Sequence, residues 1–482
     1  MAMQMISKDF KYQNLEHYLI DMIETGRFDV GEKLPSLRDV SQKMNVSLAT
    51  VTHAYMELEK KGIIEARPRS GYYVRQKVAH LPIPDSPEHN VQRGNLSRTQ
   101  LIQTVLGIVG EKGMLPFGCI CADSSLLPHK ALARIMNSVL RSSGQDIVGY
   151  ESIQGNPLLR KQVSWRMQEH GCRVTSNDVL VTFGAMEALY LALRSTTRPG
   201  DNVVIQSPTY FCFLQLLENL GLRAIEVASC PTNGVSPRDL DRAFSRFDIA
   251  ACILAPNFNN PDGSLIPDVV KKEIVTLCES YHIPLIEDDV SGDLYCDTDG
   301  RPRPLKSFDK TGNVIHCSSF SKTIAPGFRV GYMIPGKKLD KALEIKATTN
   351  VSCSTPTQLA VGKYLEEGLY DRHLRKLRTC ICNQRSTMQQ YLPEYFPEGT
   401  RATQPKGGGV LWVELPKQVD GTKLFFDVKK YNISISPGAI FSTSDSFTNF
   451  IRLSCVGFWN EDMRAGLETI GRLAKEQIEQ NG

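Results

Sequence analysis

Five apolar segments separated by helix-like stretches constrain the fold of this chain more than any other feature. Between residues 178 and 321, buried strands are indicated by DVLVTFG, NVVIQSP, IAACILAP, IPLIEDD and NVIHCSSFS. Helical patterns such as MEALYLALRS and KKEIVTLCESYH lie between them. Strands that alternate with helices predict a mostly parallel sheet covered by helices, which places the fold in the α/β class.

The end of the chain predicts a smaller lobe. Three strand-like segments, GGGVLWVELP, NISISPGAIF and FIRLSCVGF, precede the helical pattern EDMRAGLETIGRLAKEQIEQ. We therefore expect residues 115–482 to form a large α/β domain with a small α+β lobe. Residues 78–114 are interpreted as a linker, because their prolines bias the preceding residues away from helix.

Composition excludes several classes of protein. A net charge of +4 over 482 residues means that any DNA-binding face must be local. The 13 cysteines show no zinc-type spacing, and no signal peptide precedes the first domain, so we expect reduced thiols, no metal and a cytoplasmic location. The apolar runs are much shorter than the roughly 20 residues of a membrane helix.

Residues 1–77 predict a small DNA-binding head. Val40 lies in a first short helix, Asn45 begins a turn, and Ser47 caps a second helix whose Tyr55 points inward. Two short helices across a tight turn are typical of a helix-turn-helix. The second helix would present these side chains to a major groove: Leu48, Ala49, Thr50, Thr52 and His53.

The next segment, GIIEARPRSGYYV, predicts a two-stranded wing. It alternates like a strand, turns at residues 67–71 and returns, which places Arg67 and Arg69 at the tip. Arginines there can contact phosphates or a minor groove. The alternative is a small helical module that binds another protein.

The head resembles the winged helix-turn-helix of GntR-type bacterial transcription regulators. The resemblance rests on the LPSxR start of the first motif helix, the hydroxyl at the start of the recognition helix and the glycine of the wing. Leu48 departs from it, because relatives often carry a polar or basic residue there. The resemblance implies DNA contacts or wing-shaping roles for Arg38, Ser47, Thr50, Arg67 and Gly71.

The segment SSFSKTIAPGFRVGY contains a candidate reactive lysine, Lys322. A lysine that forms an imine with an aldehyde cofactor must react as the free amine, which a partly desolvated pocket with a nearby cation favours. Arg329 supplies such a cation, and the hydroxyls of Ser319 and Ser321 can bind a phosphate. The alternative is an ordinary polar loop after a strand.

Two further segments can bind parts of such a cofactor, one its phosphate and the other its aromatic ring. In VTFGAMEAL a glycine stands between a strand and a helix, so Gly184, Ala185 and Met186 offer backbone N–H groups to a phosphate. Tyr210, in SPTYF, has a ring that can stack on a pyridine. Each segment alone is also typical of an ordinary α/β loop.

Two other segments end strands in polar groups. Asn260, in APNFNNPDG, carries an amide that can donate to a phenolate oxygen, although a simple turn is the alternative. A carboxylate at the end of IPLIEDD can face a pyridine nitrogen and keep the ring protonated. The residues alone leave open whether Asp288 or Asp289 does so.

Together, these segments resemble the signature of fold-type I pyridoxal phosphate enzymes of the aspartate aminotransferase superfamily, from about residue 115 to the end. The resemblance implies pyridoxal 5'-phosphate as cofactor, with Lys322 as its Schiff-base lysine, Asp288 at the ring nitrogen and Asn260 at the ring hydroxyl. It implies a stacking role for Tyr210. It also implies phosphate contacts from Ala185, Met186, Ser319 and Arg329.

Two more matches and one departure accompany this resemblance. Tyr150, in VGYESIQGNPLLR, reaches the phosphate of the other subunit in relatives, which implies a homodimer. Arg452, in FIRLSCVG, binds the α-carboxylate of the substrate in relatives. Relatives carry a tyrosine two or three residues after the ring-nitrogen aspartate, whereas this chain has Val290 and Ser291.

The combination of both halves resembles the MocR subfamily of bacterial regulators. It implies a regulator that binds double-stranded operator DNA and senses pyridoxal phosphate, an amino compound, or both, through a Schiff base at Lys322. The alternative is a catalytically active aminotransferase, which the complete residue set favours and the fused head disfavours. A third possibility is a sensor of pyridoxal phosphate with no second ligand.

Overall fold

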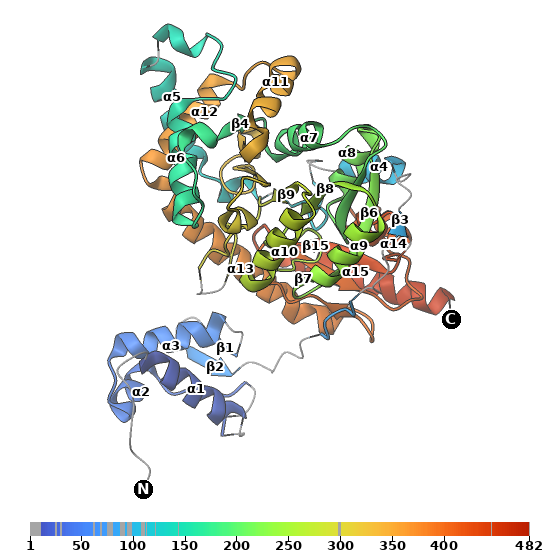
Figure 1. Ribbon diagram of the computed structural model, residues 1–482. Helices are drawn as coiled ribbons and strands as arrows, with labels where there is room; N and C mark the ends of the chain where they lie inside the picture. The colour runs from blue at the N-terminus through green and yellow to red at the C-terminus, as the bar shows by residue number, and fades with distance from the viewer. Residues whose placement is uncertain are drawn as a thin grey trace. The chain divides into compact units, whose positions relative to one another are not determined.

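The structure is a computed structural model of the chain (Figure 1). It describes residues 11–24, 27–28, 31–60, 63–67, 70–74, 81–86, 92–93, 99–107, 111, 113–120, 122–142, 144–296, 300–444 and 446–481. The chain divides into two compact units, residues 1–81 with 386–394 and residues 82–385 with 395–482. Within the described ranges, no helix has the length and apolar character needed to cross a membrane.

The first unit contains the predicted helix-turn-helix and wing. Its elements are α1 (Lys11–Glu24), α2 (Leu37–Met44), α3 (Leu48–Lys60), β1 (Ile64–Arg67) and β2 (Gly71–Val74). Asn45 ends α2 in the left-handed conformation, with φ 49°, and turns the chain into α3. Strands β1 and β2 pair antiparallel from Ile64–Val74 to Arg67–Gly71.

An apolar cluster holds the described elements of this unit together. Val51, Ala54, Tyr55 and Leu58 form the buried side of α3, and each has no exposed surface. They pack with Leu15, Leu19, Leu34, Val40, Ile64 and Val74, which come from the other helices, the segment before α2 and the wing. The predicted inward positions of α3 are therefore confirmed, and its opposite face is left outward.

A mixed, mostly parallel sheet forms the centre of the second unit, as the sequence predicted. Among the described residues its strand order is β3-β6-β5-β8-β9-β10-β11-β4, with β7 paired to β6. The parallel pairs are β6 with β5, β5 with β8, β8 with β9 and β9 with β10. The strands are β3 (Gln92–Arg93), β4 (Leu180–Thr182), β5 (Asn202–Ser207), β6 (Arg223–Cys230), β7 (Gly234–Val235), β8 (Ile249–Leu254), β9 (Leu285–Asp288), β10 (Val314–Ser319) and β11 (Gly331–Ile334).

Helices cover both faces of this sheet (Figure 1). The helices between residues 99 and 395 are α4 (Thr99–Gly107), α5 (His129–Ser142), α6 (Pro157–Glu169), α7 (Ala185–Thr196), α8 (Phe211–Asn219), α9 (Pro237–Arg246), α10 (Asp268–Ser280), α11 (Leu339–Thr349), α12 (Thr355–Glu366) and α13 (Leu369–Tyr395). Side chains alternate across a strand. Val203 and Ile205 accordingly pack with α7 and α8, whereas Val204 packs with α9 and α10.

The small lobe is built on an antiparallel sheet in the order β12-β13-β15-β14. Its elements are β12 (Arg401–Ala402), β13 (Val410–Glu414), α14 (Gly421–Lys429), β14 (Ser436–Pro437), β15 (Phe450–Ser454) and α15 (Glu461–Asn481). Trp412 of β13 is fully buried and stacks on Phe450 of β15, with ring centroids 5.1 Å apart. Arg452 lies opposite Trp412 in the register of these two strands.

The stretch interpreted as a linker contains regular structure. Within residues 78–114, β3 pairs with β6 of the large sheet, and α4 spans Thr99–Gly107. Ile102 and Val105 on α4 are buried. The high content of proline and polar residues between positions 78 and 98 masked the apolar pattern of the helix that follows.

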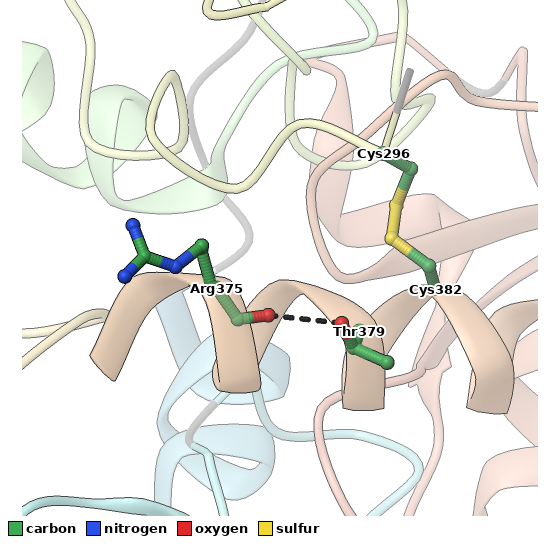
Figure 2. Close-up of a disulfide and its surroundings, with 4 residues drawn as sticks. All are labelled: Cys296, Arg375, Thr379 and Cys382. Atoms are coloured by element: carbon green, nitrogen blue, oxygen red, sulfur yellow. Dashed lines mark hydrogen bonds between the residues drawn. A yellow bond between two sulfur atoms is a disulfide. The ribbon is translucent and has the colours of Figure 1, made fainter. Parts of the chain in front are cut away.

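The expectation that every cysteine is a free thiol is wrong for one pair. Cys296 and Cys382 form a disulfide, with their Cα atoms 5.8 Å apart, a normal separation for this bond. Figure 2 shows Cys382 on α13, one turn beyond Thr379, whose hydroxyl donates to the Arg375 carbonyl at 2.9 Å. The two cysteines are 86 residues apart, so no local spacing in the sequence signals the pairing.

Candidate functional site

A cavity of about 260 Å³ lies at the carboxyl ends of the parallel strands. Ligands of open α/β sheets bind at this edge because the loops after neighbouring strands converge there. Ten of the residues predicted from the sequence line the cavity: Ala185, Met186, Tyr210, Asn260, Asp288, Ser319, Ser321, Lys322, Arg329 and Arg452. Gly184 adjoins them as the N-cap residue of α7.

Lys322 reaches the cavity from a tight turn after β10. The Phe320 carbonyl accepts hydrogen bonds from the backbone N–H groups of Ile324, at 2.8 Å, and Ala325, at 3.2 Å, which hold this turn. The side chain is half-buried, and its Nζ donates to the Ile120 carbonyl at 2.6 Å. The lysine is therefore presented to the cavity by a fixed backbone.

The N-terminus of α7 and Arg329 form a cradle for an anion. Gly184 has φ 82°, a conformation that favours glycine, and the first N–H groups of α7 follow it. The Arg329 guanidinium donates to the Phe183 carbonyl at 3.1 Å and to Ser321 Oγ at 3.4 Å. A Cβ atom on Gly184 would lie 2.7 Å from Arg329 Nη2, so the glycine keeps room for the guanidinium.

The two neighbouring carboxylates have different surroundings. Asp289 is bound on both oxygens, because Arg301 Nη2 donates to Oδ2 at 2.6 Å and Asn257 Nδ2 donates to Oδ1 at 3.0 Å. Asp288 lines the cavity and is buried, and no described residue hydrogen-bonds to its Oδ1. The structure therefore places Asp288, rather than Asp289, where a ring nitrogen can meet it.

Burial, with a smaller contribution from the neighbouring Asp289 carboxylate, raises the pKa of Asp288 from 3.8 to about 7. Desolvation disfavours the charged form of a carboxyl group unless a cation or a donor compensates for it. A ligand that carries a protonated nitrogen would supply that compensation. The open Oδ1 atom thus has the properties of an acceptor for such a nitrogen.

Arg452 and Asn260 are coupled at the other end of the cavity. Arg452 is buried, and its Nη1 donates to Asn260 Oδ1 at 3.0 Å. Its Nη2 donates to Ser436 Oγ at 2.8 Å and to the Gly118 carbonyl. Because the Asn260 oxygen accepts from Arg452, its amide nitrogen is the group left to donate to a ligand.

Several lining residues were not among the predicted site residues. They include Leu106 of α4, the segment Gly118, Cys119 and Ile120, and the buried side chains Asn257 and Asn259. Val290 and Ser291, noted for the missing tyrosine, also line the cavity. The FNN pattern near Asn260 was a usable signal, whereas residues 118–120 contribute carbonyl groups that leave no mark in a sequence.

Tyr150 is not brought to this cavity. Its side chain is 91% exposed, and it follows the short helix Gly144–Ile147. Val148, two residues earlier, is 85% exposed. Both side chains lie on the surface of the large domain.

A cluster of Glu287, Asp289 and His316 has the residue types of a metal site, and its ligand atoms lie within 4.8 Å of one another. The protein already engages these groups. Glu287 accepts from the backbone N–H groups of Leu305, at 2.6 Å, and Lys306, at 3.1 Å, and it lies 2.9 Å from His316 Nδ1. Glu287 of β9 and His316 of β10 are therefore paired with each other across the two strands, and Asp289 is bound by Arg301 and Asn257.

The head presents most of the predicted DNA-binding residues on its surface. Ser47 caps α3, and its Oγ accepts from the Thr50 N–H at 3.1 Å. Arg67 ends β1 and stacks on the Tyr73 ring, with its guanidinium 4.2 Å from the ring centroid. Exposed or half-exposed positions are Arg38, Ser47, Leu48, Thr50, Thr52, Arg67 and Gly71, whereas Arg69 falls outside the described residues.

The fold and the site define a fold-type I aminotransferase-like domain joined to a winged helix-turn-helix. Comparison with protein families supports both parts. Residues 121–470 match the family of class I and II aminotransferases, and residues 11–74 match the gntR family of bacterial regulatory proteins.

Individual relatives agree with this assignment. The HTH-type transcriptional regulator YjiR of Escherichia coli is 35% identical over 97% of this chain and 100% of its own length. The HTH-type transcriptional regulator NorG of Staphylococcus aureus is 30% identical over 92% of this chain and 100% of its own length. The α-aminoadipate aminotransferase LysN of Thermus thermophilus, solved with N-(5'-phosphopyridoxyl)-L-leucine, is 26% identical with a TM-score of 0.73, over 79% of this chain and 95% of its own.

The chain therefore belongs to the HTH-type transcriptional regulators of the GntR family that carry an aminotransferase-like domain, the MocR subfamily.

Proposed function

We propose that this protein regulates transcription in response to pyridoxal 5'-phosphate and an amino compound that meet at Lys322. The observation that carries the proposal is the buried Asp288 Oδ1 atom without a described partner, in one cavity with Lys322 and Arg329. A buried acceptor that is left open costs free energy unless a ligand supplies the donor. The protonated ring nitrogen of pyridoxal phosphate is such a donor.

The remaining polar groups fit the same cofactor. Lys322 would hold it covalently through Nζ, while Ala185, Met186, Ser319, Ser321 and Arg329 would bind its phosphate. The Asn260 amide would donate to the ring oxygen, and Tyr210 would stack on the ring. When bound, the cofactor supplies an aldehyde carbon that can exchange one amine for another.

The second ligand would be an amino compound with a carboxylate. Arg452 is a buried cation at the end of the cavity, and a carboxylate can form two parallel hydrogen bonds with a guanidinium. The leucine adduct bound by LysN is a ligand of this kind. An amine that displaces Lys322 from the cofactor would free the lysine. If the domain has two arrangements, the ligand would shift the population toward the one that it binds more tightly.

A homodimer would complete the site and present two heads to DNA. The exposed Tyr150 and Val148 would lie at the interface, with Tyr150 directed to the phosphate of the partner subunit. Two winged heads, each with α3 in a major groove, would bind two half-sites of an operator. A regulator of bacterial genes acts where the chromosome is, in the cytoplasm.

The test is binding of the purified full-length protein to DNA from upstream of its own and neighbouring genes, with and without pyridoxal phosphate. Sequence-specific binding should change with the cofactor, and Lys322→Ala should abolish the change. Lys341→Ala is the matched control, because Lys341 is exposed and pairs with Glu344 on the surface. The proposal would be refuted in favour of an aminotransferase if DNA binding is the same with and without the cofactor and the protein turns over amino acid and keto acid repeatedly.

A further inference from the structure

The outward face of the recognition helix begins with two apolar side chains. Leu48 is 47% exposed, and Ala49 next to it is also exposed, whereas Val51 and Tyr55 are buried in the core of the head. The first turn of a recognition helix is the part that contacts base edges in helix-turn-helix complexes. The methyl groups of Leu48 and Ala49 therefore occupy positions where many DNA-binding proteins have polar side chains.

The polar side chains around this turn are engaged within the helix. Ser47 Oγ accepts from the Thr50 N–H at 3.1 Å, and the two hydroxyls share a hydrogen bond of 2.7 Å. Thr52 Oγ1 donates to the Leu48 carbonyl at 2.8 Å. One hydroxyl proton of the Ser47–Thr50 pair is left over, which suits a phosphate oxygen rather than a two-bond contact with a base.

One larger polar side chain follows on the same face of α3. His53 lies one turn after Ala49 and is 3.9 Å from the Glu57 carboxylate. A neighbouring carboxylate competes with a base for the histidine ring. At the start of α3, contact with a base therefore falls mainly to Leu48 and Ala49.

We propose that Leu48 and Ala49 recognise the C5 methyl group of a thymine in the major groove of the operator. The methyl group is the apolar feature that distinguishes thymine at this edge, and apolar side chains read it by contact. Covering a half-exposed leucine with a methyl group removes apolar surface from water on both sides. The inference rests on the proposed function, because it requires a head that binds a defined sequence.

The experiment begins with selection of a preferred duplex from a random pool by the full-length protein. Each thymine of that duplex is then replaced by deoxyuridine, which removes the methyl group and keeps every base-pair hydrogen bond. At one thymine in each half-site, affinity should fall about fourfold, the effect of losing one buried methyl-sized group. Leu48→Ala should weaken binding to the thymine duplex by a similar factor and should lose less affinity than the unaltered protein when deoxyuridine stands at that position, because only the Ala49 contact remains.

Met56→Ala is the matched control. Met56 is an apolar residue of the same helix and is 52% exposed, but it lies two turns beyond Leu48, toward the end that leaves the groove. This variant should keep both the affinity and the response to deoxyuridine. Folding of each variant is checked by its far-ultraviolet circular dichroism.

The outcomes separate the inference from the function on which it rests. The inferred thymine contact is wrong if a sequence is selected but deoxyuridine has no effect at any position, or if Leu48→Ala responds to deoxyuridine like the unaltered protein. In that case the proposed function as a sequence-specific regulator still stands. If no sequence is selected, the sequence-specific regulator and the contact fail together.

Discussion

Replacing Asp288 by asparagine should stabilise the protein without its cofactor, although Asp288 lines the cavity in which we propose the cofactor binds. The carboxyl group is buried, its Oδ1 has no described partner, and its pKa is raised from 3.8 to about 7. The folded state therefore disfavours the charged form. A difference of roughly three pKa units corresponds to about 4 kcal/mol.

The pH dependence of this effect has a definite sign. Below pH 3.8 the carboxyl group is protonated in both states and costs nothing. Between pH 3.8 and about pH 7 the unfolded chain loses its proton first, so the free energy of unfolding falls as pH rises. Above about pH 7 the folded state is charged as well, and the full cost is present.

The assay is urea unfolding of the cofactor-free protein at pH 5 and pH 8. Asp288→Asn should be more stable than the unaltered protein by about 4 kcal/mol at pH 8 and by about 2 kcal/mol at pH 5. Saturating pyridoxal phosphate should reverse this order, because the variant lacks the carboxylate that we propose meets the ring nitrogen. Equal or lower stability of the variant at pH 8, or an advantage that does not shrink at pH 5, would refute the reasoning.

The adjacent carboxylate provides a control of opposite sign. Asp289 forms a buried ion pair with Arg301 at 2.6 Å, so Asp289→Asn leaves a buried guanidinium with less compensation. Loss of one partner of a buried pair costs about 3–5 kcal/mol. This variant should therefore be destabilised at both pH values.

Three further predictions follow from the site and the disulfide. Gly184→Ala should weaken pyridoxal phosphate binding by about tenfold or more, measured by titration, because its Cβ would push the Arg329 guanidinium away from the phosphate. Cys382→Ser should lower the free energy of unfolding by about 2–4 kcal/mol in oxidising buffer and by much less in reducing buffer, since its bond to Cys296 closes a long loop. Monocarboxylic amino acids should change the absorbance of the bound cofactor at concentrations at least about tenfold lower than dicarboxylic ones. Among the described lining residues, Lys322 and Arg329 are assigned to the cofactor, so Arg452 is the cation that can pair with a ligand carboxylate. The second carboxylate of a dicarboxylic ligand would be buried without a cation, which is costly.

Much of the large domain and its site could be predicted from the sequence for one physical reason. The carboxyl ends of parallel strands lie along one edge of the sheet, so side chains that follow separate strands meet there. Asp288 and Ser319 are the last residues of β9 and β10, Tyr210 follows β5, and the structure places all three on one cavity. A position at the carboxyl end of a strand, or just after it, was therefore enough to group them.

The remaining features depend on contacts that a sequence does not encode locally. Asp288 and Asp289 are identical in type and adjacent, and their difference comes from Arg301, which binds Asp289. The bond between Cys296 and Cys382 needs the packing of a loop against α13. Helix α4 was hidden because the polar segment before it dominated the composition of its neighbourhood.

The carbonyl groups of residues 118–120 give the cavity a built-in competitor. Lys322 donates to the Ile120 carbonyl, and Arg452 donates to the Gly118 carbonyl, so the chain itself occupies the two cations that the proposed ligands require. Hydrogen bonds to charged groups contribute about 1.5–3 kcal/mol each, and a bound ligand must replace them. A ligand that takes these two cations must therefore supply hydrogen bonds that match those of the carbonyl groups, which lowers the affinity that its own contacts would otherwise give.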